Sequence, residues 1–149
     1  MKNYIVYVFA LLFTIQAIGQ QPPTQKPKLF SNFPDNINCS ETELASIFTA
    51  AAGQNISLSF SNNFTFGGTV TSMEVKYSNL QSAIIKSPVF NNAVFHISKR
   101  TNPDNSITYV GQIINQNYFD GYQLTRDTFY NYHLLKIETD NLIQIDSFH

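Results

Sequence analysis

The sequence has one cysteine, no tryptophan and few charged residues. Cys39 is the only cysteine, so no disulfide can form within the chain, and a folded domain must be held together by packing alone. The three histidines, His96, His133 and His149, are far apart in the sequence and show none of the short spacings of zinc ligands. We therefore expect no metal and no other cofactor.

An excess of charge of one sign is also missing. Nine Lys and Arg residues stand against ten Asp and Glu residues, which gives a net charge of −1. Such a chain lacks the positive field that attracts the phosphates of nucleic acids, so nucleic acid is not an expected partner. It also lacks a basic cluster that could hold an anionic membrane surface.

Catalytic motifs are absent as well. The sequence has no G-x-S-x-G nucleophile motif, and Cys39 directly precedes a helix cap, where packing is the ordinary role of a thiol. The acidic residues stand singly or in expected turns, as at Asp104, Asp120 and Asp127, rather than as a pair across a cleft. We therefore expect that the protein is not an enzyme.

An apolar N-terminal segment is present. Lys2 precedes an apolar run from Ile5 to Ile15, and small residues follow up to Gly19. This pattern is typical of a secretory signal peptide at 1–19. A membrane anchor is the alternative, but it needs about 20 apolar residues, and Gln16 interrupts the run. We expect a secreted, periplasmic or cell-envelope protein, with no stable membrane insertion once the signal is removed.

The segment after the signal is poor in apolar residues. Residues 20–28, QQPPTQKPK, contain three prolines and two lysines but no aliphatic side chain. Such a stretch cannot bury enough apolar surface to offset the entropy lost on ordering, so it predicts a flexible leader. Residues 29–149 are then expected to form a single α+β domain, which is long enough for one core but not for two.

Helix signals follow Cys39. Ser40 and Glu43 have the S-x-x-E spacing of a capping box, and Gly53 is a natural stop. Cys39 is placed to pack on the new helix as a hydrophobic staple. The apolar face of the predicted helix consists of Leu44, Ile47, Phe48 and Ala51.

After Gly53 the hydrophobic period changes to two, which is typical of half-buried strands. We expect an antiparallel sheet of about six or seven strands, packed against one N-terminal amphipathic helix. Residues 141–146, NLIQID, are expected to add a short edge strand. The alternative is a partly closed small β-barrel, because Gly67-Gly68 and Gly111 could bend or curve the sheet.

The stretch NPDN predicts a tight hairpin. Pro103 suits the second position of a type I turn, and Asn105 tolerates the left-handed conformation that closes a three-residue loop. This turn places Lys99 opposite Tyr109. One face of the hairpin then carries the apolar set Phe95, Ile97, Ile107, Tyr109 and Ile113, and the other carries the wetter set His96, Ser98, Arg100, Thr108 and Gln112.

Aromatic residues are plentiful, with 13 Phe and eight Tyr. Rigid aromatics beside Asn and Gln are favoured at recognition surfaces, although loop aromatics also tuck into the ends of a core. Lys99 and Arg100 add positive charge nearby. The candidate contact residues in or beside the loops between 115 and 132 are Tyr118, Phe119, Tyr122, Phe129, Tyr130 and Tyr132.

These observations together predict an exported, non-catalytic binding module that contacts a protein or a glycan outside the cytoplasm. One alternative is a small envelope hydrolase, or a carrier with a ligand cavity inside its sheet. Either would need a cavity lined by His96 or His133 with a carboxylate within hydrogen-bond reach. A structural or inhibitory subunit is the other alternative.

Overall fold

The computed structural model describes residues 26–139. The expected signal peptide, most of the expected leader and the NLIQID segment lie outside these residues. Within 26–139, no helix has the length and apolar character needed to cross a membrane.

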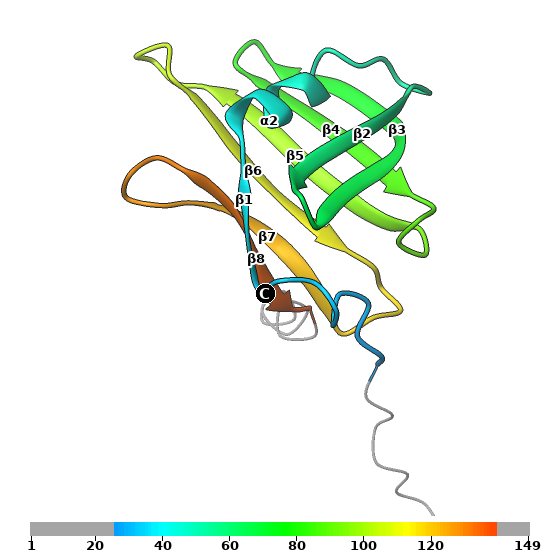
Figure 1. Cartoon of the computed structure of the whole chain (residues 1–149). Helices are drawn as coiled ribbons and strands as arrows, with labels where there is room; N and C mark the ends of the chain where they lie inside the picture. Colours follow the sequence, from blue (N-terminus) through cyan, green and yellow to red (C-terminus); the bar gives the residue numbers. More distant parts are fainter. Residues whose placement is uncertain (1–25, 140–149) are drawn as a thin grey trace, which may run out of the picture.

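The described chain folds into one short helix and an eight-stranded antiparallel sheet (Figure 1). The strands lie in the order β1-β8-β7-β6-β5-β4-β3-β2, so consecutive strands from β2 to β8 are neighbours. The two outermost strands, β1 and β2, contact each other, which makes the sheet a nearly closed barrel. The elements are β1 (Asn36–Cys39), α2 (Glu41–Ile47), β2 (Asn55–Ser61), β3 (Phe64–Tyr77), β4 (Leu80–Ser87), β5 (Ala93–Thr101), β6 (Ile107–Ile114), β7 (Asp120–Arg126) and β8 (Tyr132–Glu138).

This arrangement corrects the expected fold of six or seven strands behind a leading helix, and it fits the partly closed barrel. The helix does not come first, because β1 precedes it and pairs with β8, with Ile37 opposite Leu134. A four-residue strand is too short to show a clear period of two. Its partner lies far away in the sequence, so only tertiary pairing defines it.

The helix begins where the sequence predicts and ends earlier. Ser40 is the N-cap, and its hydroxyl accepts a hydrogen bond from the backbone N–H of Glu43. The helix ends at Ile47 rather than near Gly53. The hydroxyls of Ser46 and Thr49 donate to backbone carbonyls three residues earlier, which favours turns over further helix.

The β5–β6 hairpin has the predicted register. The backbone N–H of Asn102 donates to the carbonyl of Ser106, Asn105 has a φ of 63°, and Lys99 lies opposite Tyr109. The predicted apolar face is buried except at Ile107, which is 38% exposed. Ile107 is the first residue of β6; it pairs with Thr101 of β5 but lies outside the stretch of β6 that pairs with β7.

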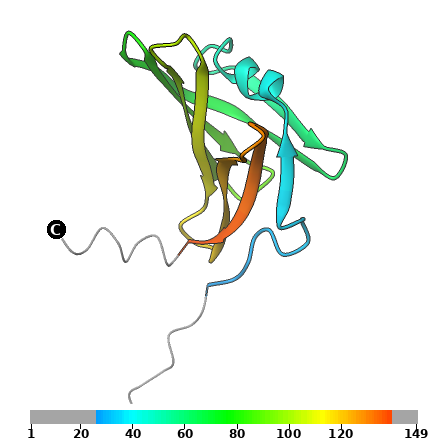
Figure 2. The same ribbon diagram turned by 90° about the vertical axis from the view of Figure 1, so that its left-hand side faces the viewer.

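Aromatic rings fill the interior of the barrel. Phe64, Phe95 and Tyr122 point inward from the strands and are fully buried. Phe30, from the segment before β1, closes one end, with its ring 5.1 Å from that of Tyr122 and 5.4 Å from that of Phe90. We therefore locate the core inside the barrel. Figure 2 shows helix α2 at the other end.

Three glycines, Gly68, Gly111 and Gly121, allow close approach of strands. A Cβ added at Gly68 would lie 2.6 Å from the Lys86 carbonyl oxygen, and one at Gly111 would lie 2.6 Å from the His96 carbonyl oxygen. The register of β2 and β3 runs through Gly67 and Gly68 without a bulge, whereas β3 shifts its register against β4 further along the strand. These glycines thus permit close approach of neighbouring strands, and Gly67-Gly68 does not form the bulge that was one expectation.

Candidate functional site

The topology separates the two predicted aromatic loops. Loop 115–119 precedes β7 and loop 127–131 follows it, so they lie at opposite ends of a seven-residue strand. A strand rises about 3.3 Å per residue, which places the loops roughly 20 Å apart. We call the end with α2 and loop 127–131 the helix end, and the end with Phe30 and loop 115–119 the plug end (Figure 1). The six aromatics therefore do not form one surface.

Two of the six aromatics belong to the core. Tyr122 is buried, and its hydroxyl donates to the backbone carbonyl of Pro34 at 2.6 Å. Tyr132 is also buried, and its hydroxyl accepts a 3.0 Å hydrogen bond from the backbone N–H of Tyr109. Neither ring is accessible to a partner. For these two residues, packing in the core, which was the alternative to partner binding in the sequence analysis, is the observed role.

Two others are half-buried at the plug end. The hydroxyl of Tyr118 accepts a 2.7 Å hydrogen bond from the side-chain amide of Asn91. The backbone N–H of Phe119 donates to the carbonyl of Pro27, and the ammonium of Lys28 lies 5.9 Å from the centroid of the Phe119 ring. These contacts tie loop 115–119 to its neighbours, so neither ring stands free in solvent.

The remaining two aromatics project into solvent at the helix end. Phe129 is 82% exposed and Tyr130 is 71% exposed. They lie at the tip of the β7–β8 hairpin, and Tyr130 takes a left-handed φ of 69°. A left-handed conformation is uncommon for a residue other than glycine, so other contacts must hold it.

Asp127 supplies those contacts. One of its carboxylate oxygens accepts from the backbone N–H groups of Phe129 and Asn131, both at 2.8 Å. The other accepts from the side chains of Asn131 at 3.2 Å and His133 at 3.1 Å. These hydrogen bonds lower the pKa of the Asp127 carboxyl to about 2, and the bond from the backbone N–H of Asn131 has the largest effect. The loop backbone is thus organised around one ionised carboxylate.

Arg126 fixes the exposed tyrosine from the other side. Its guanidinium lies 4.6 Å from the ring centroid of Tyr130 and 5.4 Å from that of Tyr132. Its Nε also donates to the backbone carbonyl of Tyr130 at 3.3 Å. Arginine stacked on an aromatic face restricts that ring. The Tyr130 ring is therefore presented in a preset orientation.

Lys99 and Arg100 point to opposite faces of β5. Lys99 points inward, where its ammonium lies 5.2 Å from the centroid of the Phe48 ring. Arg100 points outward and lines a surface hollow of about 550 Å³. The exposed apolar residues Tyr77 and Val110 line the same hollow. Sequence analysis missed this patch, although the hairpin register already placed Val110 opposite Ser98 on the wetter face.

Of the two histidines on strands, only His133 has the neighbours expected of a hydrolase or carrier site, namely a hollow and a carboxylate within hydrogen-bond reach. His96 is exposed on the outer face of β5. His133 borders a hollow and lies 3.1 Å from Asp127, but its other ring nitrogen lies 3.1 Å from the side-chain oxygen of Asn36. Asp127 also accepts from the backbone N–H groups of Phe129 and Asn131, so the His133–Asp127 pair belongs to the contacts that order loop 127–131. Within 26–139, no group of three or more His, Cys, Asp or Glu side chains could hold a metal ion.

Cys39 has the packing role expected of it. The residue ends β1 and is buried, and burial raises the pKa of its thiol to about 12. The thiol is therefore protonated at neutral pH and is a weak nucleophile.

Comparisons with known proteins add no relatives. No protein-family model, curated protein or solved structure matches this chain.

Proposed function

We propose that the protein is an exported, non-catalytic binding module that docks a protein partner through loop 127–131. The observation that carries this proposal is the pair of solvent-exposed rings, Phe129 and Tyr130, on a loop held by Asp127 and Arg126. Export follows from the N-terminal signal pattern, which lies outside the described residues.

The physical argument rests on preorganisation. An exposed aromatic ring contributes about 1.5–3 kcal/mol when it is fully buried at an interface. A loop that is already ordered loses little conformational entropy on binding, so more of that gain remains as affinity. Aromatic side chains are also the usual energetic centres of protein interfaces. Loop 127–131 combines the two properties.

The surroundings of the loop favour a protein over a glycan. Proteins bind a glycan mainly through hydrogen-bonding side chains that surround an aromatic ring and are not engaged elsewhere. Here both carboxylate oxygens of Asp127 and the side-chain amide of Asn131 are already engaged within the loop. The free surface that remains is chiefly the rings of Phe129 and Tyr130, which suits an apolar depression on a protein.

The test compares partner capture by three forms of the mature chain. The double variant Phe129→Ser/Tyr130→Ser removes the exposed rings. The control Val89→Ser removes a side chain that is 74% exposed in the β4–β5 loop, at the plug end. The proteins are immobilised, exposed to the extracellular and periplasmic fraction of the producing cells, and the captured proteins are identified by mass spectrometry.

We expect the unmodified chain and Val89→Ser to retain the same protein, and the double variant to lose it at least tenfold. Circular dichroism should show the same fold in all three, because the changed side chains are exposed. Equal capture by all three forms would contradict the proposal. A different outcome is that no protein is captured, while the unmodified chain binds a glycan on an array and the double variant does not. Loop 127–131 would then be the binding surface, but its partner would be a glycan.

A further inference from the structure

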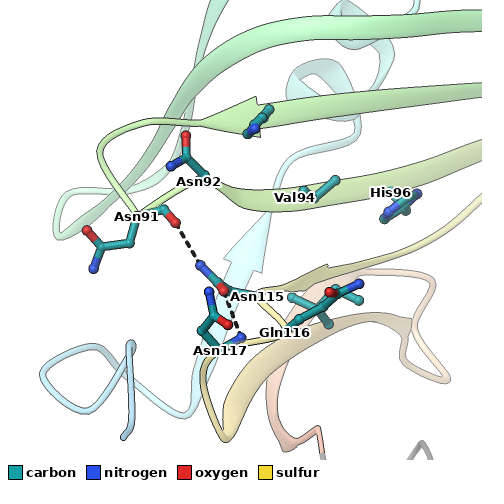
Figure 3. Close-up of a pocket in the computed structure, with 9 residues that line it drawn as sticks. Asn91, Asn92, Val94, His96, Asn115, Gln116 and Asn117 are labelled. Atoms are coloured by element: carbon teal, nitrogen blue, oxygen red, sulfur yellow. Dashed lines mark hydrogen bonds between the residues drawn. The ribbon is translucent and has the colours of Figure 1, made fainter.

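A polar hollow lies on the outer face of the barrel at the plug end (Figure 3). It has a volume of about 340 Å³, at the small end of the range of ligand sites. It opens between the β4–β5 loop and the segment that follows β6. The residues that line it are Lys86, Asn91, Asn92, Val94, His96, Ile114, Asn115, Gln116 and Asn117.

The base of the hollow is built by Asn115, which is buried. Its side-chain nitrogen donates to the backbone carbonyl of Asn91 at 2.8 Å, and its side-chain oxygen accepts from the backbone N–H of Asn117 at 3.0 Å. Figure 3 shows both bonds: the first links the two loops, and the second lies within the segment that follows β6. The hydroxyl of Tyr118 holds the Asn91 side chain from outside. The two loops are therefore fixed relative to each other.

Two consecutive residues of the β4–β5 loop take left-handed conformations. Asn91 has a φ of 49° and Asn92 a φ of 66°. Asparagine tolerates this region better than most residues, but two in succession are uncommon. The backbone N–H of Asn92 donates to the carbonyl of Ser87, which holds the turn closed. The backbone at Asn92 is thus held in place beside the hollow.

The strand register sets the apolar part of the hollow. Lys86 lies opposite Val94, and Val94 lies opposite Ile114, so these three residues form a row across β4, β5 and β6. His96 lies two residues along β5 from Val94 on the same outward face. A small ligand on this row would meet two aliphatic side chains in the middle and polar groups around them.

We propose that this hollow binds a saccharide that carries a carboxylate. Each amide offers two donors and an acceptor, which matches ring hydroxyls that both donate and accept. The side chains of Asn92, Gln116 and Asn117 supply these groups, and Val94 with Ile114 supplies an apolar surface for the C–H face of a sugar ring.

The charge of the lining selects the acidic sugar. Lys86 carries the only full charge among the lining residues, and no Asp or Glu lines the hollow. A cation without an acidic neighbour in the lining favours a negative group on the ligand. This site does not depend on loop 127–131, which lies at the other end of the barrel, so either proposal can fail without the other.

The test uses the ¹⁵N-labelled mature chain and two matched probes, trigalacturonate and its methyl ester. The ester has the same sugar rings and hydroxyls but carries an uncharged methyl ester in place of each carboxylate. Binding is followed by the NMR shifts of the side-chain amides of Asn92, Gln116 and Asn117. Two variants are titrated in parallel: Lys86→Gln at the hollow, and Lys76→Gln, which removes the same charge at the helix end.

We expect saturable shifts with trigalacturonate, and weaker binding of the ester by about two- to fivefold, as for one exposed ion pair. Lys86→Gln should weaken trigalacturonate binding by the same factor and abolish the preference for the acid, whereas Lys76→Gln should change neither. Gln116→Ala should weaken both probes by about three- to tenfold, through the loss of hydrogen bonds.

The absence of saturable shifts with both probes would overturn the proposal. So would equal binding of acid and ester by the unmodified chain, a comparison that involves no variant. The Phe129→Ser/Tyr130→Ser protein should bind trigalacturonate normally. A loss there would show that the sugar binds at loop 127–131 rather than in the hollow.

Discussion

Two tyrosines of the core, Tyr122 and Tyr132, use their hydroxyl groups to bind the backbone. Tyr122 and Tyr132 bury their rings and place each hydroxyl on a backbone group that would otherwise lack a partner. Tyr130 is only two residues from Tyr132 but has an exposed ring. The difference lies in the hairpin geometry, since Tyr132 starts β8 and points into the barrel.

Tyr132→Phe is expected to destabilise the fold while leaving the ring in place. The change removes the acceptor of the Tyr109 backbone N–H, and a buried donor without a partner costs about 1–3 kcal/mol. Urea unfolding followed by circular dichroism measures the loss. Tyr130→Phe is the control and should leave the midpoint unchanged, because its hydroxyl is on an exposed ring. Equal midpoints for the two variants would show that the Tyr132 hydroxyl contributes nothing.

At the scale of elements, the β7–β8 hairpin is ordered by electrostatics. Its loop packs few apolar side chains and relies on the Asp127 carboxylate, which accepts from Phe129, Asn131 and His133. Such a loop is sensitive to pH, in contrast to the β5–β6 hairpin, whose register follows from its turn and its buried face.

Lowering the pH should loosen loop 127–131 before the barrel unfolds. The pKa of Asp127 is about 2 in the folded chain, below the ordinary value of about 3.9. A lowered pKa means that the carboxylate stabilises the folded loop above about pH 4, and that this contribution is lost as the pH falls towards 2. The protection factors of the amides of Phe129 and Asn131, in which the intrinsic pH dependence of hydrogen exchange is divided out, should therefore fall over that window. Asp127→Asn should remove this fall; protection factors that stay constant down to pH 2 in the unmodified chain would contradict the assignment.

The β5–β6 pair depends instead on the absence of a side chain. Gly111→Ala would place a Cβ 2.6 Å from the His96 carbonyl oxygen, which is backbone and cannot turn aside. We expect a loss of about 1–3 kcal/mol in the free energy of unfolding, as in other overpacked sites. Gly67→Ala is the matched control, because its nearest atom would be 4.0 Å away. Chemical denaturation of both variants compares them directly, and similar stabilities would show that the strands can separate at Gly111 without cost.

For the whole molecule, the segment before β1 completes the core. Asp120 is buried, and its carboxylate accepts from the backbone N–H groups of Leu29 and Phe30 at 2.6 and 2.9 Å. Lys136 adds an ion pair with Asp35 at 2.8 Å. These contacts hold the Phe30 ring in the plug end. The barrel is thus closed by residues from both ends of the described chain.

Phe30→Ala is expected to open the plug end. Removing a fully buried phenylalanine costs about 3–5 kcal/mol, and this ring contacts Phe64, Phe90 and Tyr122. We expect a lower urea midpoint together with increased fluorescence of the apolar dye 1-anilinonaphthalene-8-sulfonate. Phe129→Ala, at an exposed ring, should change neither. An unchanged midpoint for Phe30→Ala would mean that the segment before β1 is not part of the core.

The local features of this fold were predictable from the sequence. The Ser40 cap, the β5–β6 register and the packing role of Cys39 each depend on residues within about ten positions, so turn chemistry and hydrophobic period are sufficient to predict them.

Only the tertiary structure decided the number of strands, the closure of the barrel and the accessibility of the aromatics. Strand β1 exists because it pairs with β8, as in the contact between Asn36 and His133, 97 positions apart. Loops 115–119 and 127–131 are close in sequence but lie at opposite ends of β7, and Asn91 meets Asn115 only when β4, β5 and β6 align. Such contacts join distant residues, and a local pattern of side chains carries no information about which distant strands will meet.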